Sequence, residues 1–515
     1  MPARRLSQPE SRFRPLTCRS RQRMLRSAVS MSVLFAVPFA LILLAGCKPV
    51  GPNYTRPTYT APAAYKEAGA TAVVPPPNPA GGSWQPANPS DGMLRGNWWE
   101  IYQDQQLNQL EERIATTNVQ LRQATENYLA AHDQVAAARA NYYPTISANV
   151  APTATQASRN QPNYNSGGQS NYRTYIVDGQ ATWEPDFWGR VRRTVEAAQA
   201  GAQVSAADVA IVDLTLHAEL ATDYFELRGL DSQIKLLGQT VADLQSQLDL
   251  TQRRLSGGVA TAVDVAQAQT EFDTVHAQLI DAGVARAQFE HAIGTIANYD
   301  LSQFSIPSSP LDLTLPKVPL GVPSQLLERR PDIAAAERQA AQANAQIGIA
   351  ISAFYPNISL TAAAGFESAH PGTWIQGPSA MWALGGQAAE LLFDAGQRHA
   401  VTDAARHTYE AQADGYRNTV FSAFEDVEDQ LSGLRILEQE SGVEQSAVAS
   451  ARNSFDLSNQ RYKGGVTSYL EVLTAEQTLL QNQNTAINIQ TRQFAASVSL
   501  VRALGGGWDV TQLPK

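Results

Sequence analysis

Two spacings of hydrophobic residues alternate along this chain, one typical of helices and one typical of strands. Residues 191 to 255 contain no Pro and few Gly, which predicts one helix of about 65 residues, roughly 95 Å long at the rise of an α-helix. Residues 103 to 141 contain helix formers without Pro or Gly and predict another helix. In the long helix, one set of positions recurs at intervals of three and four, as in a heptad seam. This set is Ile234, Leu237, Val241, Leu244, Leu248, Thr251 and Leu255.

The other faces of the long helix carry Gln, Ser, Asp and Ala. One narrow apolar stripe among small and polar residues fits a wall of helices packed as in a coiled coil. It fits a plain antiparallel bundle equally well, because periodicity alone does not separate the two.

Two stretches between the helical regions alternate with a period of two. In NISLTAAAGF, residues 357 to 366, and in TYIVDGQATW, residues 174 to 183, every second residue is apolar or small and the residues between them are mostly polar. One apolar and one polar face over about 10 residues is the pattern of a membrane β-strand. A small soluble sheet is the alternative for any single strand.

Each predicted strand has a partner, at about residues 144 to 158 and 379 to 392, with turn-forming sequence between the two members. An open sheet of four strands would leave edge amides and carbonyls unpaired in lipid, at several kcal/mol each. The smallest closed membrane barrels have about 8 strands. Strands of this kind can therefore enter a membrane only if several chains share one barrel.

The chain is also an internal duplication. LSGGVATAVDV at residues 255–265 reappears as YKGGVTSYLEV at residues 462–472, 207 positions later, with a carboxylate six residues after the second glycine in both. The same offset aligns Leu220 with Val427, whereas NYYPTIS and AFYPNIS align at an offset of 212. This period is longer than the ~20 to 50 residues of solenoid repeats. It indicates an old duplication of a whole domain.

The N-terminus predicts export and lipid attachment. SVLFAVPFALILLAGC follows Arg-rich sequence, is too short for a spanning helix, and ends in LAGC at Cys47. This order resembles the bacterial lipobox, so residues 1 to 46 are the expected lipoprotein signal peptide, and a start at Met24 would give that signal a normal size. N-acyl and S-diacylglycerol groups on Cys47, palmitate among them, would anchor the mature chain. An ordinary secretory signal that contains a Cys is the alternative.

Charge and cysteine content narrow the possible partners. The net charge is −9, and loss of the eight Arg and one Glu in residues 1 to 46 would change it to about −16. So acidic a body is a poor partner for nucleic acid. Only Cys18 and Cys47 occur, so the mature chain has no intrachain disulfide.

Domain boundaries follow from composition and from the repeat. Residues 47 to 96 are rich in Pro, Gly, Ala and Asn, which predicts an extended strap on the body. The first structural repeat is expected at 97–320, and the second at 321–515. Each would consist of a helix, a β-hairpin, a long helix, a tip and a return helix. The expected hairpins are at about 142–188 and about 354–393, and the expected tips at 255–263 and 462–470.

Four segments resemble the outer-membrane efflux lipoproteins of the TolC superfamily, in the OprM/NodT branch. They are GCKPVGPNYTRP, GNWWEIYQDQQLNQL, FWGRVRR and LLERRPDIAAAERQAAQANAQIGIAISAFYPNISL, in family order between Cys47 and about Trp508. The resemblance implies an α+β membrane protein, a homotrimer with an α-barrel of long helices and a shared 12-stranded β-barrel to which each chain contributes four strands. It further implies a Gram-negative outer membrane and its lipid, since Lys48 stands where Asp would indicate retention in the inner membrane.

The family is the passive exit duct of tripartite efflux pumps. The resemblance therefore implies two protein partners, a periplasmic adaptor (membrane fusion) protein and an inner-membrane RND-type transporter. Drugs, solvents, metals and aromatic acids are all compatible cargo. A lipid-anchored periplasmic helical scaffold and the outer-membrane component of a type I protein secretion system are the alternative functions.

In such a duct the two GGV segments would be helix-turn-helix tips at the periplasmic mouth, where glycine permits a positive φ. The resemblance implies adaptor docking there. The docking residues would be Ser256, Gly257, Gly258, Val259, Ala260 and Thr261, together with Lys463, Gly464, Gly465, Val466, Thr467 and Ser468.

Aligned on the glycines, Tyr462 matches the family's gate tyrosine, Asp264 matches its carboxylate partner, and Glu471 stands where Asp is frequent. Threefold symmetry would make each carboxylate a ring that favours cations. The alternative is a solvated helix start that the helix dipole stabilises. Thr467 and Thr474 replace an Arg and a second Asp of the family, so the bracing network departs from the family pattern.

Enzymatic function is not expected. The seven His are scattered, without HExxH or metal-ligand spacing. The GGG at residues 505–507 lacks the preceding strand and following helix of a phosphate-binding loop. We therefore expect no catalytic residue, no cofactor site and no metal site.

Overall fold

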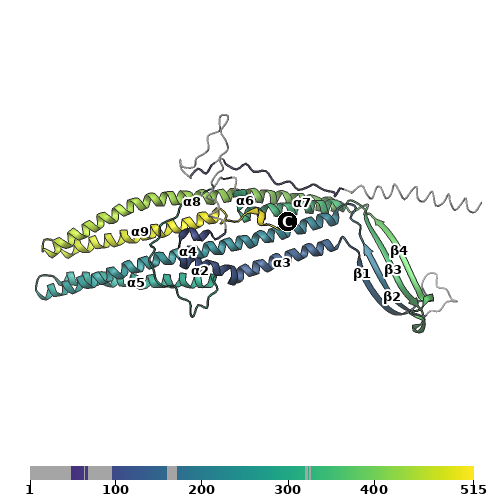
Figure 1. The fold of residues 1–515 in the computed structure, drawn as a ribbon, viewed down its shortest axis with the longest axis horizontal. Helices are drawn as coiled ribbons and strands as arrows, with labels where there is room; N and C mark the ends of the chain where they lie inside the picture. Colours follow the sequence, from purple (N-terminus) through teal and green to yellow (C-terminus); the bar gives the residue numbers. More distant parts are fainter. Residues whose placement is uncertain are drawn as a thin grey trace, which may run out of the picture.

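The computed structural model describes residues 48–62, 64–67, 96–158, 160, 171–318, 320, 323 and 326–514. The molecule is elongated (Figure 1). A curved sheet forms one end, and long helices run side by side from it to two helical turns at the opposite end.

Two copies of one structural unit make up most of the chain, and each contains a 22-residue helix, a β-hairpin, a 67-residue helix and a 35-residue helix. The helices are α3 (Val119–Ala140), α4 (Arg190–Ser256) and α5 (Ala262–Ile296) in the first copy, and α7 (Pro331–Ser352), α8 (Gln397–Lys463) and α9 (Tyr469–Ala503) in the second. Corresponding helices begin 212 positions apart before the hairpins and 207 after them. The slip between the two offsets therefore lies inside the hairpins.

Shorter elements flank the two copies: η2 (Trp98–Tyr102), α2 (Gln105–Thr117), α6 (Leu326–Arg329) and η6 (Val510–Gln512). The single helix predicted over residues 103 to 141 is wrong, because Asn118 divides it into α2 and α3. Asn118 has an extended backbone, with ψ of 129°, and its side chain accepts hydrogen bonds from the first turn of α3. Its amide also donates to the Ile296 carbonyl at 2.8 Å. Asn favours such a helix start over a helix interior.

The sheet has the strand order β1-β2-β3-β4, with every neighbouring pair antiparallel. The strands are β1 (Thr145–Gln156), β2 (Asn171–Trp183), β3 (Asn357–Ser368) and β4 (Ala380–Ala389), and short helices η4 (Pro371–Thr373) and η5 (Gly377–Ser379) lie between β3 and β4. The predicted strand positions are confirmed. The register places most polar residues of the sheet on one face and most apolar residues on the other, with Arg173 on the apolar face and Ile176 and Met381 on the polar face.

The main hydrophobic core lies at mid-length of the molecule, where η2 and α2 pack against α4, α8 and α9. Trp98, Tyr102, Phe225 and Phe494 are buried there. The Tyr102 hydroxyl is 3.0 Å from the Ser497 hydroxyl, so the ring is fixed at both its apolar and its polar end.

Beyond this core, α4 packs on α5 and α9 along the predicted seam. Leu237, Leu244, Leu248 and Thr251 are buried, but Leu255, at the last turn, is exposed. The prediction is thus confirmed for the seam and wrong for its end, where the partner helices stop. None of the helices in the described part of the chain combines the length with the apolar composition that a membrane span requires.

Residues 48–62 run as an extended strap along α4 and α7, as predicted for this segment. The Arg193 side chain donates to the carbonyls of Val50 and Gly51, both at 3.2 Å, and the Tyr54 hydroxyl donates to Glu337 at 2.6 Å. Cys47 and the predicted signal peptide lie outside the described residues.

Candidate functional site

The two turns that join the long helices share one backbone geometry. The first glycine of each GGV is still helical, with φ of −82° at Gly257 and −76° at Gly464. The second glycine is left-handed, with φ of 73° at Gly258 and 74° at Gly465. A side chain at the second position would be strained by its own backbone conformation, so the repeated glycine pair has a direct structural cause.

Each turn ends its helix with the same pair of hydrogen bonds, a Schellman motif. The outer bond runs from Val259 N–H to the Arg254 carbonyl at 2.8 Å in one turn and from Val466 N–H to the Arg461 carbonyl at 2.9 Å in the other. The valines project from the end of the molecule and are 76% and 72% exposed. The twelve residues predicted to dock an adaptor all lie in or beside these turns and are exposed or half-buried.

The carboxylate of Asp264 stabilises the start of α5. Its Oδ2 accepts from the Thr261 N–H and from the Thr261 hydroxyl, both at 2.8 Å, and the Asp264 N–H donates to the Thr261 hydroxyl oxygen at 3.2 Å. This is a capping box. The local partners of Asp264 are therefore those of a helix start, at a position exposed enough to face an aperture as well.

The carboxylate of Glu471 occupies the equivalent position in the second turn but has another partner. Ser468, before α9, makes no capping hydrogen bond through its side chain. The exposed Glu471 carboxylate instead lies 3.8 Å from the Arg461 guanidinium of the same hairpin. Of the two positions that depart from the family pattern, Thr467 has a buried hydroxyl without a hydrogen-bond partner, and Thr474 donates to the Leu470 carbonyl at 2.9 Å.

Tyr462 contacts the first hairpin through Arg254. The Arg254 guanidinium lies 4.5 Å from the centre of the Tyr462 ring, a cation–π contact. The same group donates to the Tyr462 carbonyl at 3.4 Å and to the Lys463 carbonyl at 3.3 Å. The Tyr462 ring also lies 5.5 Å from the Tyr469 ring, centre to centre. Arg254 thus joins the tip of the α4–α5 hairpin to the tip of the α8–α9 hairpin.

A second layer of polar contacts joins the hairpins farther from the tips. Glu476 of α9 accepts from the Gln247 amide of α4 at 3.1 Å, and Glu271 of α5 accepts from the Gln477 amide of α9 at 2.6 Å. Both glutamates are buried, and Oε2 of Glu476 has no partner. Burial raises the pKa of Glu476 to about 7, the nearby charges of Glu271 and Asp243 act in the same direction, and the Gln247 hydrogen bond acts against them. This carboxylate therefore changes charge near neutral pH.

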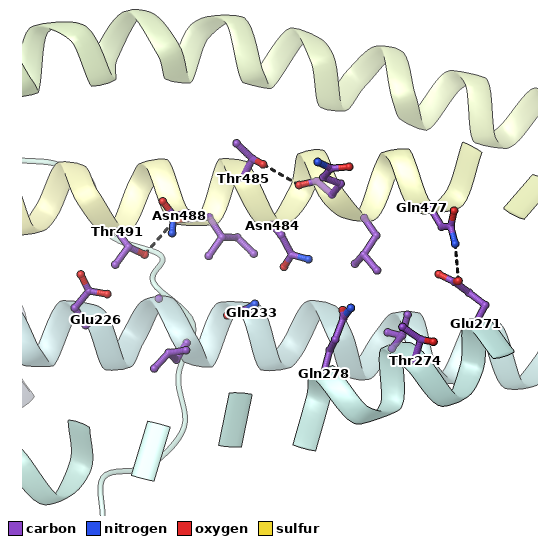
Figure 2. Close-up of a pocket in the computed structure, with 16 residues that line it drawn as sticks. Glu226, Gln233, Glu271, Thr274, Gln278, Gln477, Asn484, Thr485, Asn488 and Thr491 are labelled. Atoms are coloured by element: carbon purple, nitrogen blue, oxygen red, sulfur yellow. Dashed lines mark hydrogen bonds between the residues drawn. The ribbon is translucent and has the colours of Figure 1, made fainter. Parts of the chain in front are cut away.

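A cavity of about 610 Å³ opens beside this layer, between α9 and the α4–α5 pair. Figure 2 shows amide and hydroxyl side chains reaching into it from both sides, with the Gln477–Glu271 hydrogen bond at one end. Its labelled lining includes Gln233, Gln278, Asn484 and Asn488. A cavity with such walls holds water. The two hairpins therefore meet across a polar gap in this region, beside an apolar contact in which Leu480 of α9 packs against Leu237 and Val275 of the other hairpin.

Sequence reasoning found the turns and Tyr462 but missed Arg254, Gln247 and Glu476. One signal for Arg254 was present, because the offset of 207 places it on Arg461, directly before the matching turn. No comparable signal marks Gln247 or Glu476, whose counterparts in the other repeat are Ser454 and Gln269.

Comparisons with known proteins agree with this architecture. A family model described as outer membrane efflux protein matches residues 110–298 and 322–506. The toluene efflux pump outer membrane protein TtgC of Pseudomonas putida is 29% identical over 485 residues, which cover 92% of this chain and 96% of that protein. The pyoverdine export outer membrane protein OpmQ of Pseudomonas putida is 28% identical over 438 residues, which cover 84% of this chain and 92% of that protein.

A solved structure extends the comparison to the fold. The open-state outer membrane channel MtrE of Neisseria gonorrhoeae is similar, with a TM-score of 0.76 and 28% identity. The match covers 90% of this chain and 99% of that chain. Similarity over nearly the whole length applies to the sheet and to the helices together.

Proposed function

The chain belongs to the outer membrane efflux protein family, and on that premise we propose that three copies of it form the passive exit duct of a tripartite efflux pump. Efflux across the outer membrane is the activity that the family and its named relatives share. Our proposal for this chain adds four features to that activity: a trimer, a closed barrel, a lipid anchor and the pump partners.

The distribution of exposed side chains on the sheet carries this proposal. The apolar face is open, with Ile146 79%, Trp382 77% and Leu384 75% exposed, and most positions of the polar face are exposed as well. A soluble sheet would bury such large apolar side chains against another layer of the fold. A strand wall that faces lipid outside and water inside has the arrangement seen here.

The open edges of the sheet support the sharing of one barrel among copies. β1 and β4 are the edge strands, and each presents unpaired backbone groups that lipid cannot satisfy. Pairing of β4 of one copy with β1 of the next would close the sheet after three copies into a 12-stranded barrel, above the minimum of about 8 strands. Leu392 and Phe393, three and four residues after the end of β4, are 89% and 83% exposed, as expected for side chains that a neighbouring copy or lipid covers.

The helical end is the proposed site of contact with the other pump components. The two tips comprise twelve residues, six from each turn, and the two turns have the same backbone conformation. Each tip includes one exposed valine. A repeated surface of this kind suits docking by a periplasmic adaptor, which would connect the duct to an RND-type inner-membrane transporter.

Lipidation at Cys47 would add an anchor in the outer membrane, because acyl chains contribute about 0.8 kcal/mol for each buried methylene. The strap that begins at Lys48 supports this assignment, since its contacts near the start of α4 place it close to the sheet end (Figure 1). The relatives at 28–29% identity are named for toluene and for pyoverdine. Identity at this level therefore does not select a cargo within the class of small molecules.

Planar-bilayer recording tests the proposal. The purified full-length protein should migrate as a trimer that heating converts to monomer, and it should give discrete conductance steps at low protein concentration. A monomer without conductance would overturn the duct and favour a lipid-anchored periplasmic scaffold. Mass spectrometry of the mature N-terminus tests the anchor separately, since a diacylated Cys47 is expected and an unmodified one contradicts that part alone.

A further inference from the structure

Charged residues are rare in the described strands, and their positions are not random. Arg173, Asp178 and Glu367 are the charged residues of β1 to β4. By register, Asp178 pairs with Asn149 and Gly365, and Glu367 pairs with Ile176, so both acids belong to the polar face. Arg173 pairs with Ala154 and belongs to the apolar face, near the hairpin end. The sheet therefore separates its charges by sign between its two faces.

Asp178 is held rigidly in the middle of β2. One carboxylate oxygen accepts from the Asn149 amide at 3.2 Å and the other from the Gln180 amide at 2.8 Å. Gly365 lies opposite, and a Cβ there would overlap the Val177 carbonyl oxygen and the Asp178 backbone. β2 and β3 thus approach closely at this residue, which fixes the carboxylate against the polar face.

The hydrogen-bond partners of Asp178 carry no opposite charge. Its hydrogen-bond donors in the described part of the chain are neutral amides, which stabilise a carboxylate without cancelling its charge. A carboxylate shielded from solvent by polar neighbours and curved backbone exerts a stronger field on passing ions than a freely hydrated one.

Building on the proposed duct, we propose that Asp178 determines the charge selectivity of its barrel section. Three copies would place three fixed carboxylates around one lumen, and a ring of like charge favours ions of the opposite sign. Cationic and zwitterionic solutes would pass this section more readily than anionic ones. The barrel would act in this way independently of the acidic residues at the tips, which lie at the far end of the molecule (Figure 1).

Reversal potentials of the reconstituted trimer in a KCl gradient test this inference. We expect Asp178→Asn to lower the permeability ratio of K⁺ over Cl⁻ about twofold at 0.1 M salt and by more at 0.01 M, because the Debye length grows from about 10 to about 30 Å. The variant keeps an amide of the same shape between Asn149 and Gln180. Glu367→Gln, nearer the hairpin end, should have a smaller effect.

Arg173→Gln is the matched control, since it also removes one charge per chain but from the opposite face. It should leave the ratio unchanged. If Asp178→Asn prevents trimer formation, Asn149→Lys places an ammonium group opposite the intact carboxylate and should lower the ratio in the same way.

The outcomes separate this inference from the duct itself. Conducting variants with a wild-type ratio at both salt concentrations would overturn the role of Asp178 and leave the duct intact. A change of ratio with Arg173→Gln alone would overturn it as well, because it would place the other face toward the lumen. Absence of any conductance in the wild-type trimer would overturn the duct first.

Discussion

The two helical hairpins of this chain have equal helix lengths, the same glycine turn and an arginine at the equivalent position. The two arginines nevertheless contact different partners. Arg461 of the second hairpin stays within it and faces Glu471 at 3.8 Å. Arg254 of the first reaches across to the ring and carbonyl of Tyr462. In the first hairpin Asp264 is already engaged by Thr261, which frees Arg254 for the neighbouring hairpin.

This difference shows which features of a duplicated unit must stay equal. The turn requires two glycines and a Schellman hydrogen-bond pair, so both copies retain them. The side chains around the turn have diverged, because Arg254 contacts the neighbouring hairpin whereas Arg461 contacts its own. We therefore expect motion at the tips to occur between hairpins, with each hairpin moving as a unit.

The largest effect should come from removal of the arginine that joins the hairpins. Arg254→Ala removes a cation–π contact and hydrogen bonds to two carbonyls, together about 1 kcal/mol. We expect the leak conductance of the reconstituted trimer in planar bilayers to rise about fivefold, since 1 kcal/mol changes a population by that factor.

Arg461→Ala is the matched control at the equivalent position. It removes an exposed ion pair within one hairpin, a type of pair that contributes little, and its leak conductance should stay within about twofold of wild type. Equal leak in the two variants would break the comparison, because it would show that the two arginines have the same role.

A pH-dependent effect should follow from the buried Glu476. Its pKa of about 7 is above the ordinary value of 4.5, so the protonated form is favoured when the hairpins are packed. The contribution of this residue to packing is thus fully present below about pH 4.5 and is lost as the pH rises through about 7. We expect the leak conductance to be lower at pH 5 than at pH 8.

Glu476→Gln should remove this part of the pH dependence and keep the leak low at pH 8. The groups that face Glu476 are Gln247 and Asp243 of α4, Glu271 of α5 and Tyr469 of its own helix. Glu271→Gln should lower the apparent pKa rather than abolish the transition. An unaltered pH profile in Glu476→Gln would show that another group titrates.

The smallest effect should separate the two carboxylates beside the turns. Asp264→Ala destroys a capping box and should destabilise the start of α5 by about 1 kcal/mol, visible as faster amide hydrogen exchange in residues 262–268. Glu471→Ala loses only an exposed ion pair, about 0.5 kcal/mol or less. If both acids line the aperture, the two variants should nevertheless weaken cation preference and raise leak to a similar degree. Unchanged selectivity in Asp264→Ala would leave that residue as a helix cap alone.

Most of the fold could be predicted from the sequence. Helix length and strand alternation are local patterns, and the repeat is visible when the chain is aligned with itself. α4 and the four strands are where periodicity placed them. The break at Asn118 was missed because Asn is tolerated inside helices, and its decisive contact is with the carbonyl of Ile296, far along the chain. Exposure of Leu255 was missed because a seam pattern does not show where the partner helices end.

The candidate site was predictable only in part. Glycine pairs and alignment marked the turns, but the partner of Tyr462 depends on how two hairpins lie beside each other, which no local pattern states. The pKa of Glu476 is likewise a property of packing, because burial between three helices causes it. In the sequence, Asp264 and Glu471 are both carboxylates six residues after the second glycine of a turn. Only their contacts in the structure show that they have different partners.

The equal lengths of the paired helices, 67 and 67 residues and then 35 and 35, restrict how such a chain can evolve. Insertion of one residue in α4 alone would advance its tip by about 1.5 Å and rotate everything beyond it by about 100°, turning Arg254 away from Tyr462. The length of the helical region could change in evolution only through matched insertions in α4, α5, α8 and α9. Each insertion would have to be a multiple of about seven residues, which restores the seam. The hairpin loops at the other end carry no such constraint, and there the two halves already differ in length.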